Sequence, residues 1–102
     1  MYYIYILYSV ASNVYYVGYT RNYNLRLIQH NEQDKFNTYT SKHRPWKLKA
    51  VFEIGSEEKI AIQIERYIKK QKSRKLIELL SDVNFIPNNK LSKLIRVFHE
   101  CD

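Results

Sequence analysis

Two tyrosine-rich segments at the amino end constrain the fold more than any other feature of this sequence. Eight of the ten tyrosines lie within the first 23 residues. Residues 2–8 (YYIYILY) are β-branched or aromatic on both faces, which predicts a strand that is covered on both sides. Residues 15–20 (YYVGYT) predict a second strand, and the small and polar residues 9–14 (SVASNV) are typical of a turn. The amino end is therefore expected to form a hairpin.

A third strand is predicted over residues 46–54 (WKLKAVFEI), directly after Pro45. Its side chains alternate, which favours one buried face with Trp46, Leu48, Ala50 and Phe52, and one exposed face with Lys47, Lys49 and Val51. Residues 31–44 between the hairpin and this strand are expected to form a polar, basic loop.

Helical spacing predicts a helix after the hairpin, capped by Asn22 or Asn24 and ending near His30. The positions expected to face the core are Leu25 and Ile28, and those expected to share an exposed face are Arg26 and His30.

Three further helices are predicted after the third strand. Ser56 can cap one that ends near Lys70, with a buried stripe of Ile60, Ala61, Ile64 and Ile68. Ser73 can cap another that ends near Leu80. Residues 88–99 predict a short terminal helix, because apolar side chains recur there at helical spacing: Leu91, Leu94, Ile95 and Phe98. The expected fold is α+β, with a small three-stranded antiparallel sheet flanked by helices, in the order β-β-α-β-α-α plus a C-terminal helix.

Charge and composition favour a polyanionic partner. Lys and Arg number 17 against 10 acidic residues, a formal charge of +7, and nucleic acid is the commonest partner of such a chain. No apolar run reaches the roughly 18 residues of a membrane span. One cysteine, Cys101, cannot form an internal disulfide, so a cytoplasmic location is expected. Two glycines and one cysteine exclude a glycine-rich phosphate loop and a zinc ribbon.

The predicted hairpin carries Tyr3-Ile4-Tyr5 and Tyr16-Val17-Gly18, with ten residues between Tyr5 and Tyr16. These tripeptides resemble the pair that names the GIY-YIG nuclease superfamily, with Tyr3 in place of the first glycine. Further matches follow in order, namely Arg26 in NLRL, His30 one turn later, the run TYTSKHRPWKL, and Glu65. The resemblance is closest to short, free-standing bacterial members and covers about residues 2–80. It divides the chain into a nuclease-like domain (1–82) and a C-terminal extension (83–102) in the same compact unit.

The resemblance implies a metal-dependent endonuclease that hydrolyses nucleic-acid phosphodiester bonds, with DNA the favoured substrate and low sequence specificity. It implies that Glu65 holds Mg²⁺ or Mn²⁺ and that Arg26 clamps the phosphate. It implies that Tyr5 is the general base, with a pKa lowered by Arg26 or the metal, that Tyr16 orients water or phosphate, and that His30 assists.

Each of these residues also has a purely structural interpretation. Glu65 could pair with Lys69 one turn later, and Gly18 could mark a bulge rather than a close approach to phosphate. Tyr5 and Tyr16 could simply pack in their strands, and His30 could have no role. Basic segments 42–49 and 66–75 are expected to contact the nucleic-acid backbone, through residues that include Lys42, Lys69, Lys70 and Lys72. The alternative function is a non-catalytic or weakly catalytic nucleic-acid-binding module that acts with a partner protein, for which the terminal helix could be the docking element.

Overall fold

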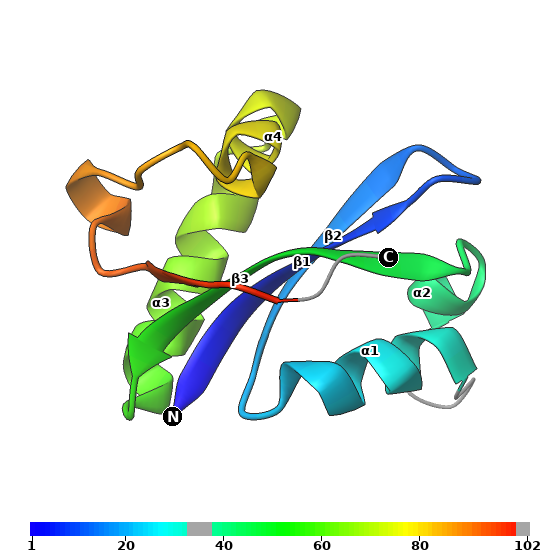
Figure 1. The fold of residues 1–102 in the computed structure, drawn as a ribbon, viewed down its shortest axis with the longest axis horizontal. Helices are drawn as coiled ribbons and strands as arrows, with labels where there is room; N and C mark the ends of the chain where they lie inside the picture. Colours follow the sequence, from blue (N-terminus) through cyan, green and yellow to red (C-terminus); the bar gives the residue numbers. More distant parts are fainter. Residues whose placement is uncertain (33–37, 100–102) are drawn as a thin grey trace.

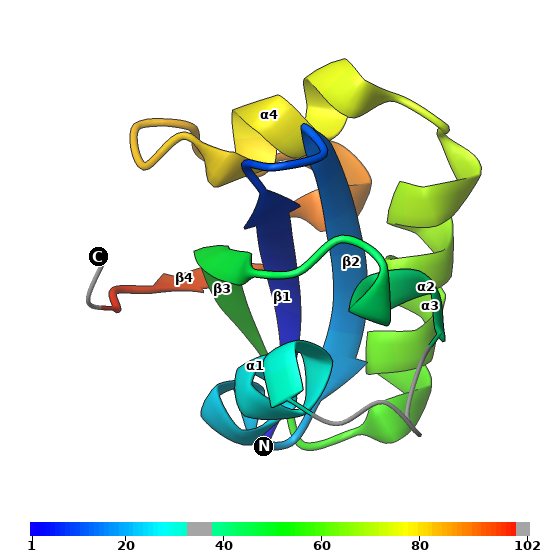
Figure 2. The same ribbon diagram turned by 90° about the vertical axis from the view of Figure 1, so that its right-hand side faces the viewer.

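A four-stranded antiparallel sheet organises the chain, in the order β2-β1-β3-β4. The computed structural model describes residues 1–32 and 38–99. The strands are β1 (Tyr2–Ser9), β2 (Val14–Thr20), β3 (Trp46–Gly55) and β4 (Ile95–Val97). Four α-helices accompany them: α1 (Tyr23–Glu32), α2 (Thr38–Ser41), α3 (Glu58–Lys70) and α4 (Arg74–Ser81). Helices α1 and α2 lie on one side of the sheet and α3 and α4 on the other (Figures 1 and 2). The predicted α+β class is confirmed.

Strand β1 lies inside the sheet, between β2 and β3. Ile4 and Ile6 pack into one apolar cluster with the inward residues of α3. Tyr5 and Leu7 pack into a second cluster on the other face, together with Trp46. The side chains of these four consecutive residues, 4–7, are fully buried, which confirms the prediction of a strand covered on both sides.

The predicted terminal helix is wrong. The region contains a 3₁₀ turn, η1 (Asn89–Leu91), followed by β4, which pairs with Val51–Glu53 of β3. The sheet therefore has four strands rather than three. Leu91 and Leu94 are buried, but Ile95 and Phe98 are exposed, so only half of the predicted stripe faces the core. The free edge of β3 offers backbone partners to Ile95 and Val97, whose branched side chains favour a strand.

Two predictions about which side chains face the core are also wrong. Helix α1 leaves Leu25 and Ile28 about half exposed and buries His30, because the helix packs on the sheet through Leu27 and His30. Val51 is fully buried, because the face of β3 that carries it lies beside Tyr5 and is covered. Lys47 and Lys49 are exposed, as expected.

Helix termini follow the predicted caps in two of three cases. Asn22 Oδ1 accepts from the Leu25 amide at 3.0 Å, and Ser73 Oγ accepts from the Leu76 amide at 3.1 Å. Helix α3 instead begins after Glu57, which makes no side-chain capping bond, so Ser56 is not its cap. The short helix α2 lies in the stretch expected to be a loop, of which residues 33–37 lie outside the described residues.

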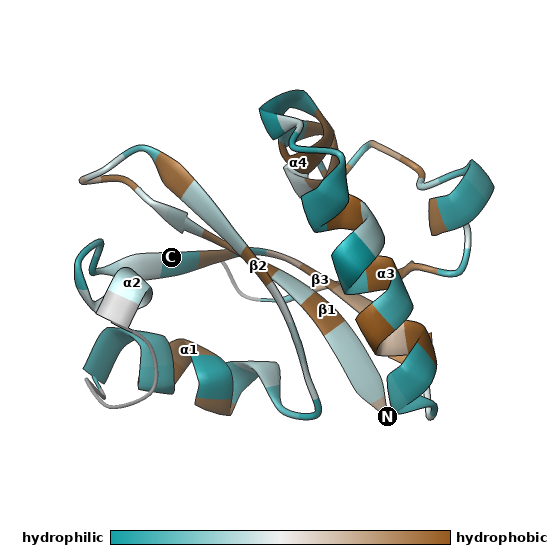
Figure 3. Cartoon of the chain, turned by 180° about the vertical axis from the view of Figure 1, so that it is seen from behind, coloured by the Kyte–Doolittle hydropathy of each residue, from teal (hydrophilic) through white to brown (hydrophobic). Residues whose placement is uncertain are grey.

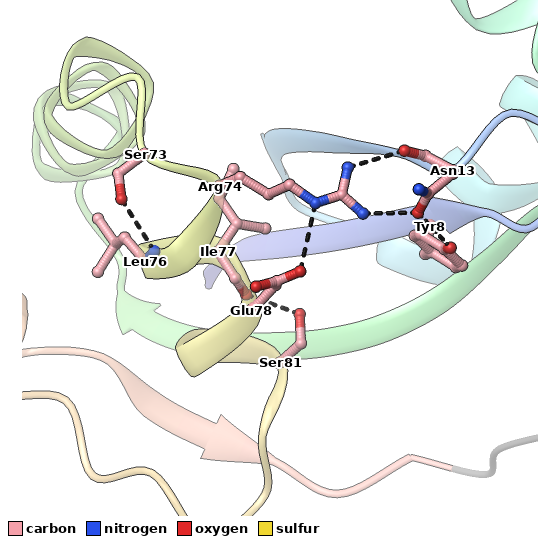
Figure 4. Close-up of polar contacts among 8 residues, drawn as sticks. All are labelled: Tyr8, Asn13, Ser73, Arg74, Leu76, Ile77, Glu78 and Ser81. Atoms are coloured by element: carbon pink, nitrogen blue, oxygen red, sulfur yellow. Dashed lines mark hydrogen bonds and ion pairs between the residues drawn. The ribbon is translucent and has the colours of Figure 1, made fainter.

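Arg74 fastens helix α4 to the turn of the hairpin (Figure 4). Its guanidinium donates to the Asn13 carbonyl oxygen at 2.8 Å and to Asn13 Oδ1 at 2.6 Å. The Tyr8 hydroxyl donates to the same Oδ1 at 2.7 Å, and Arg74 also pairs with Glu78 at 3.2 Å. Asn13 adopts a positive φ of 54°, which asparagine tolerates well. This basic residue of segment 66–75 is therefore committed to an internal contact.

Arg96 ties the C-terminal extension to the rest of the domain. Its guanidinium lies 4.7 Å from the centre of the Phe52 ring and donates to the carbonyl oxygens of Leu80, Asp82 and Phe85. Helices α3 and α4 show alternating apolar and polar bands, with the apolar residues in the core cluster (Figure 3). In the stretches 1–32 and 38–99, no helix has the length and apolarity that crossing a bilayer requires.

Candidate active site

The centre of the site is the pair formed by Tyr5 on β1 and Gly18 on β2, which face each other in the sheet. A Cβ on Gly18 would lie 2.5 Å from Tyr5 Oη and 2.6 Å from Cζ, closer than carbon atoms can approach. The two strands pair here without a register shift, so the bulge interpretation of Gly18 is wrong. The glycine leaves room for the phenol ring to lie across β2.

The hydroxyl of Tyr5 is joined to His30, which α1 carries into the core. Tyr5 Oη lies 2.9 Å from His30 Nε2, and His30 Nδ1 lies 3.1 Å from Thr40 Oγ1 on α2. His30 is only 1% exposed, so it cannot stand on an open helical face as expected. A neutral imidazole can accept from one neighbour and donate to the other, and this satisfies both of its buried nitrogens.

Burial, together with the charges of Arg26 and Arg44, lowers the pKa of His30 from 6.5 to about 4. The imidazole is therefore neutral at neutral pH. Arg44 also donates to the His30 carbonyl oxygen at 2.7 Å, so the arginine is fixed close to the ring it influences.

Burial raises the pKa of Tyr5 from 10.0 to about 12, although the positive charge of Arg26 opposes the shift. Tyr16 and Glu65 raise this pKa further through their charged forms. The expectation that Arg26 lowers the pKa of Tyr5 below its usual value is wrong, because burial outweighs the arginine. At neutral pH the phenol is protonated and can donate its hydrogen to His30.

Arg26 reaches the pair from the first turns of α1, and its charge acts on the pKa of both Tyr5 and His30. Its Nη1 donates to Gln29 Oε1 at 3.0 Å, which leaves most of its donor fork for other partners. The guanidinium and the phenol therefore lie close together.

Tyr16 lines the same face of the sheet. Its ring centre lies 4.8 Å from that of His30, 6.3 Å from that of Tyr5 and 6.2 Å from that of Trp46. The ammonium of Lys69 lies 5.4 Å above the ring. Tyr16 thus links the buried pair to a cation on α3.

Glu65 comes from α3, on the opposite side of the sheet from α1. Its carboxylate lies 3.5 Å from Lys69 Nζ, so the structural pairing considered from the sequence is present. The side chain is 17% exposed, and its charge acts on the pKa of Tyr5. Glu65 therefore lies close enough to Tyr5 for its charge to act on the phenol, although its helix packs on the other side of the sheet from α1 (Figure 1).

Three residues that were not predicted as part of the site support it. Thr40 and Trp46 belong to the run TYTSKHRPW, and Asn31 contacts Trp46. Thr40 bonds His30, and its carbonyl oxygen accepts from Trp46 Nε1 at 2.8 Å. The Asn31 side chain accepts from the Trp46 amide at 2.6 Å and donates to the Trp46 carbonyl at 3.1 Å. The run TYTSKHRPW matches the family pattern, but the spacing of its residues does not show which of their side chains point inward.

The remaining predicted substrate residues lie outside these contacts. Lys42 lies between α2 and β3, Lys70 ends α3, and Lys72 is in the turn before α4; all three are exposed. Lys69 is the predicted substrate lysine that contacts the site itself, through Glu65 and Tyr16.

One family of known domains matches this chain. The sequence model described as the GIY-YIG catalytic domain matches residues 1–78, which include every residue of the site described above. No curated protein matches the chain closely enough to be compared with it.

Proposed function

The chain belongs to the GIY-YIG catalytic domain family, a family of nucleases, and we propose that it cuts DNA phosphodiester bonds with one divalent metal ion. The observation that supports this most is the convergence of four groups from three elements. Arg26 and Glu65 act on the pKa of the buried Tyr5 phenol, and Arg26 also acts on the pKa of His30. Tyr5 and His30 contact each other directly. Hydrolysis of a phosphodiester needs neutralisation of negative charge on the phosphate and removal of a proton from the attacking water. These four residues could provide both.

Glu65 fits the needs of a magnesium ion. Mg²⁺ keeps several of its waters and takes one or two carboxylates together with substrate phosphates. Among residues 1–32 and 38–99, no group of three or more His, Cys, Asp or Glu side chains could form a closed metal cage. Glu65 with waters and phosphate oxygens is therefore the proposed donor set, for Mg²⁺ or Mn²⁺. When bound, the ion would offset negative charge on the phosphate and on the leaving oxygen.

Tyr5 and His30 would manage the proton of the attacking water. The phenol oxygen is buried in the free protein, so this role requires that substrate binding brings a water to it. The oxygen would then accept a hydrogen bond from that water while its own hydrogen is directed at His30 Nε2. The water proton then passes to Tyr5 Oη as the Tyr5 proton passes to the imidazole. Arg26 and Arg44 disfavour a charged imidazole in the free protein, and a phosphate anion next to Arg26 would lessen that penalty.

Arg26 would bind the scissile phosphate through its donor fork, and Tyr16 would orient water or phosphate through its hydroxyl. Lys69 would exchange its contact with Glu65 for a phosphate oxygen when substrate binds. Lys42, Lys70 and Lys72 would contact the nucleic-acid backbone nonspecifically, so we propose low sequence specificity. The cytoplasmic location that we propose rests on the single cysteine of the sequence. The alternative remains a binding module with little catalysis that relies on a protein partner.

A comparison of Glu65→Gln with the wild type tests the proposal. We expect Mg²⁺-dependent nicking of plasmid DNA by the wild type and a loss of at least about 100-fold in the variant. Binding of DNA in the absence of metal should be retained or slightly stronger, because a negative charge has been removed. Glu78→Gln is the matched control, since Glu78 also pairs with a cation one turn away, 3.2 Å from Arg74.

Three outcomes separate the two functions. Metal-dependent cutting that is lost only in Glu65→Gln supports the nuclease. Binding that weakens with salt, without cutting by folded wild-type protein under Mg²⁺ or Mn²⁺, supports the binding module. Equal cutting by wild type and Glu65→Gln would remove Glu65 from the mechanism.

A further inference from the structure

A groove lies between α3 and the segment around η1, away from the site described above. It has a volume of about 270 Å³ and is lined by Ile60, Gln63, Ile64, Tyr67, Lys90 and Lys93. This α3–η1 groove is slightly smaller than the roughly 300 Å³ at which sites for drug-sized ligands begin, so it suits one small group. Helix α3 and the turn η1 lie side by side in both ribbon views (Figures 1 and 2).

The lining combines an apolar wall with two cations. Ile60, Ile64 and Tyr67 form the apolar part, and the ammonium of Lys90 lies 5.4 Å from the centre of the Tyr67 ring. Lys93 adds a second positive charge and Gln63 an amide, and the lining includes no acidic side chain. A flat apolar group that carries an anion, such as the base and phosphate of a nucleotide, matches this combination.

The groove is connected to the candidate active site by a cationic surface. At about 100° per residue, Lys69 lies on the opposite side of α3 from Tyr67. Arg66 and Lys70 occupy the solvent-facing arc between them, and both are exposed. From Arg66 to Lys72 the sequence contains no acidic residue. A polyanionic strand that leaves Glu65 and Lys69 therefore meets only basic or neutral side chains on its way to the groove.

We propose that the α3–η1 groove is a subsite that holds one nucleotide of the substrate strand, with the base against Tyr67 and phosphates at Lys90 and Lys93. The proposal rests on the nuclease function proposed above, since the strand is the one that Glu65 would cut. Lys90 and Lys93 lie beyond residue 78, where the match to the family ends. The C-terminal extension thus supplies a nucleic-acid contact that the family domain alone lacks.

An NMR titration of the full chain tests the subsite. Chemical shifts are recorded in metal-free buffer while an oligothymidylate of about 12 nucleotides is added. We expect shifts at Gln63, Tyr67, Lys90 and Lys93 in addition to those near Tyr5 and Arg26. Tyr67→Leu, which keeps an apolar side chain in the core, should weaken strand binding about tenfold. Lys90→Gln/Lys93→Gln should reduce the slope of log affinity against log salt by about 1.4, the value for two phosphate contacts on a single strand.

Lys47→Gln/Lys49→Gln removes two charges from β3, outside the groove. It can lower overall affinity through segment 42–49, but the shifts at Gln63, Tyr67, Lys90 and Lys93 should persist at saturation. Shifts confined to the surroundings of Tyr5, Arg26 and Glu65 would overturn the subsite. So would equal groove shifts with inorganic phosphate, which indicate a general anion site, or thymidine monophosphate binding as tightly as the strand, which indicates a site for free nucleotides. Cleavage under Mg²⁺ is measured separately, so loss of the nuclease proposal is distinguished from loss of the groove.

Discussion

A methyl group on Gly18 would lie 2.5 Å from the phenol oxygen of Tyr5. Gly18→Ala should therefore displace a buried ring and destabilise the domain by about 1–3 kcal/mol. Cleavage should fall at least tenfold as the Tyr5–His30 bond is disturbed. Urea unfolding followed by Trp46 fluorescence measures the first effect and plasmid nicking the second. In a Tyr5→Ala background, Gly18→Ala should change the free energy of unfolding very little. Additive effects of the two substitutions would show that the methyl group does not crowd the Tyr5 ring.

Protonation of His30 should weaken the fold in mild acid. Its pKa is about 4 in the folded protein against 6.5 normally, so the unfolded chain binds the extra proton in this range. Stability from this group is complete above pH 6.5 and falls by roughly 3 kcal/mol as the pH drops to 4. Urea unfolding from pH 7 to 4.5 measures the loss. His30→Gln should flatten the profile relative to wild type, and His43→Gln should not.

Removal of Lys69 should make a metal ion easier to bind at Glu65. The two side chains lie 3.5 Å apart, so the ammonium competes with any added cation. Lys69→Gln should lower the half-saturating Mg²⁺ concentration for cleavage by up to about fivefold, the value of an exposed ion pair, while weakening DNA binding. Lys70→Gln loses the same charge without contacting Glu65. An equal shift in both variants would attribute the effect to overall charge.

Arg74 should matter for stability more than for nucleic-acid binding. Arg74→Gln removes two donated bonds to Asn13 and should destabilise the domain by about 1 kcal/mol, since the bonds are partly open to water. DNA affinity should fall less than in Lys70→Gln. Lys75→Gln, one residue along, should change stability by less than about 0.5 kcal/mol. A large loss of DNA binding by Arg74→Gln with no loss of stability would show that Arg74 binds nucleic acid rather than stabilising the fold.

The C-terminal extension should unfold together with the rest of the domain. Leu94 is buried in the main core cluster, so Leu94→Ala should cost about 2–5 kcal/mol in a single cooperative transition. Ile95→Ala, at a side chain that is 62% exposed, should cost much less. A second, separate transition in Leu94→Ala would show that residues 83–102 form an independent unit.

The hairpin, the third strand and helices α3 and α4 were predictable because their signals are long and redundant. Tyr5, Arg26 and Glu65 were located through the family resemblance, and their convergence followed from the expected fold. The ends of the chain were harder. Residues 91–98 contain five apolar positions, four of which fit helical spacing. The open edge of β3 that makes this segment a strand is a feature of the assembled sheet and leaves no local pattern in the sequence.

The environment of His30 was likewise not readable from the sequence. A polar residue in the last turns of a helix normally faces water, and its burial depends on partners from β1 and α2, 25 and 10 residues away. The pKa values of Tyr5 and His30 depend on that burial, which raises the first to about 12 and lowers the second to about 4, so the sequence did not indicate either shift. Gly18 was recognised as a point of close approach, but its neighbour is a ring of the protein itself.

Glu65 reaches the phenol from a helix on the far side of the sheet, whereas Arg26 and His30 reach it from the near side. No single supersecondary unit therefore contains the whole proposed set of groups. A half-folded chain would keep its basic charge but would lack the assembled set of side chains to which the proposed nuclease activity is assigned. If the proposed function is right, cleavage would arise only once the helices on both sides of the sheet have packed against it.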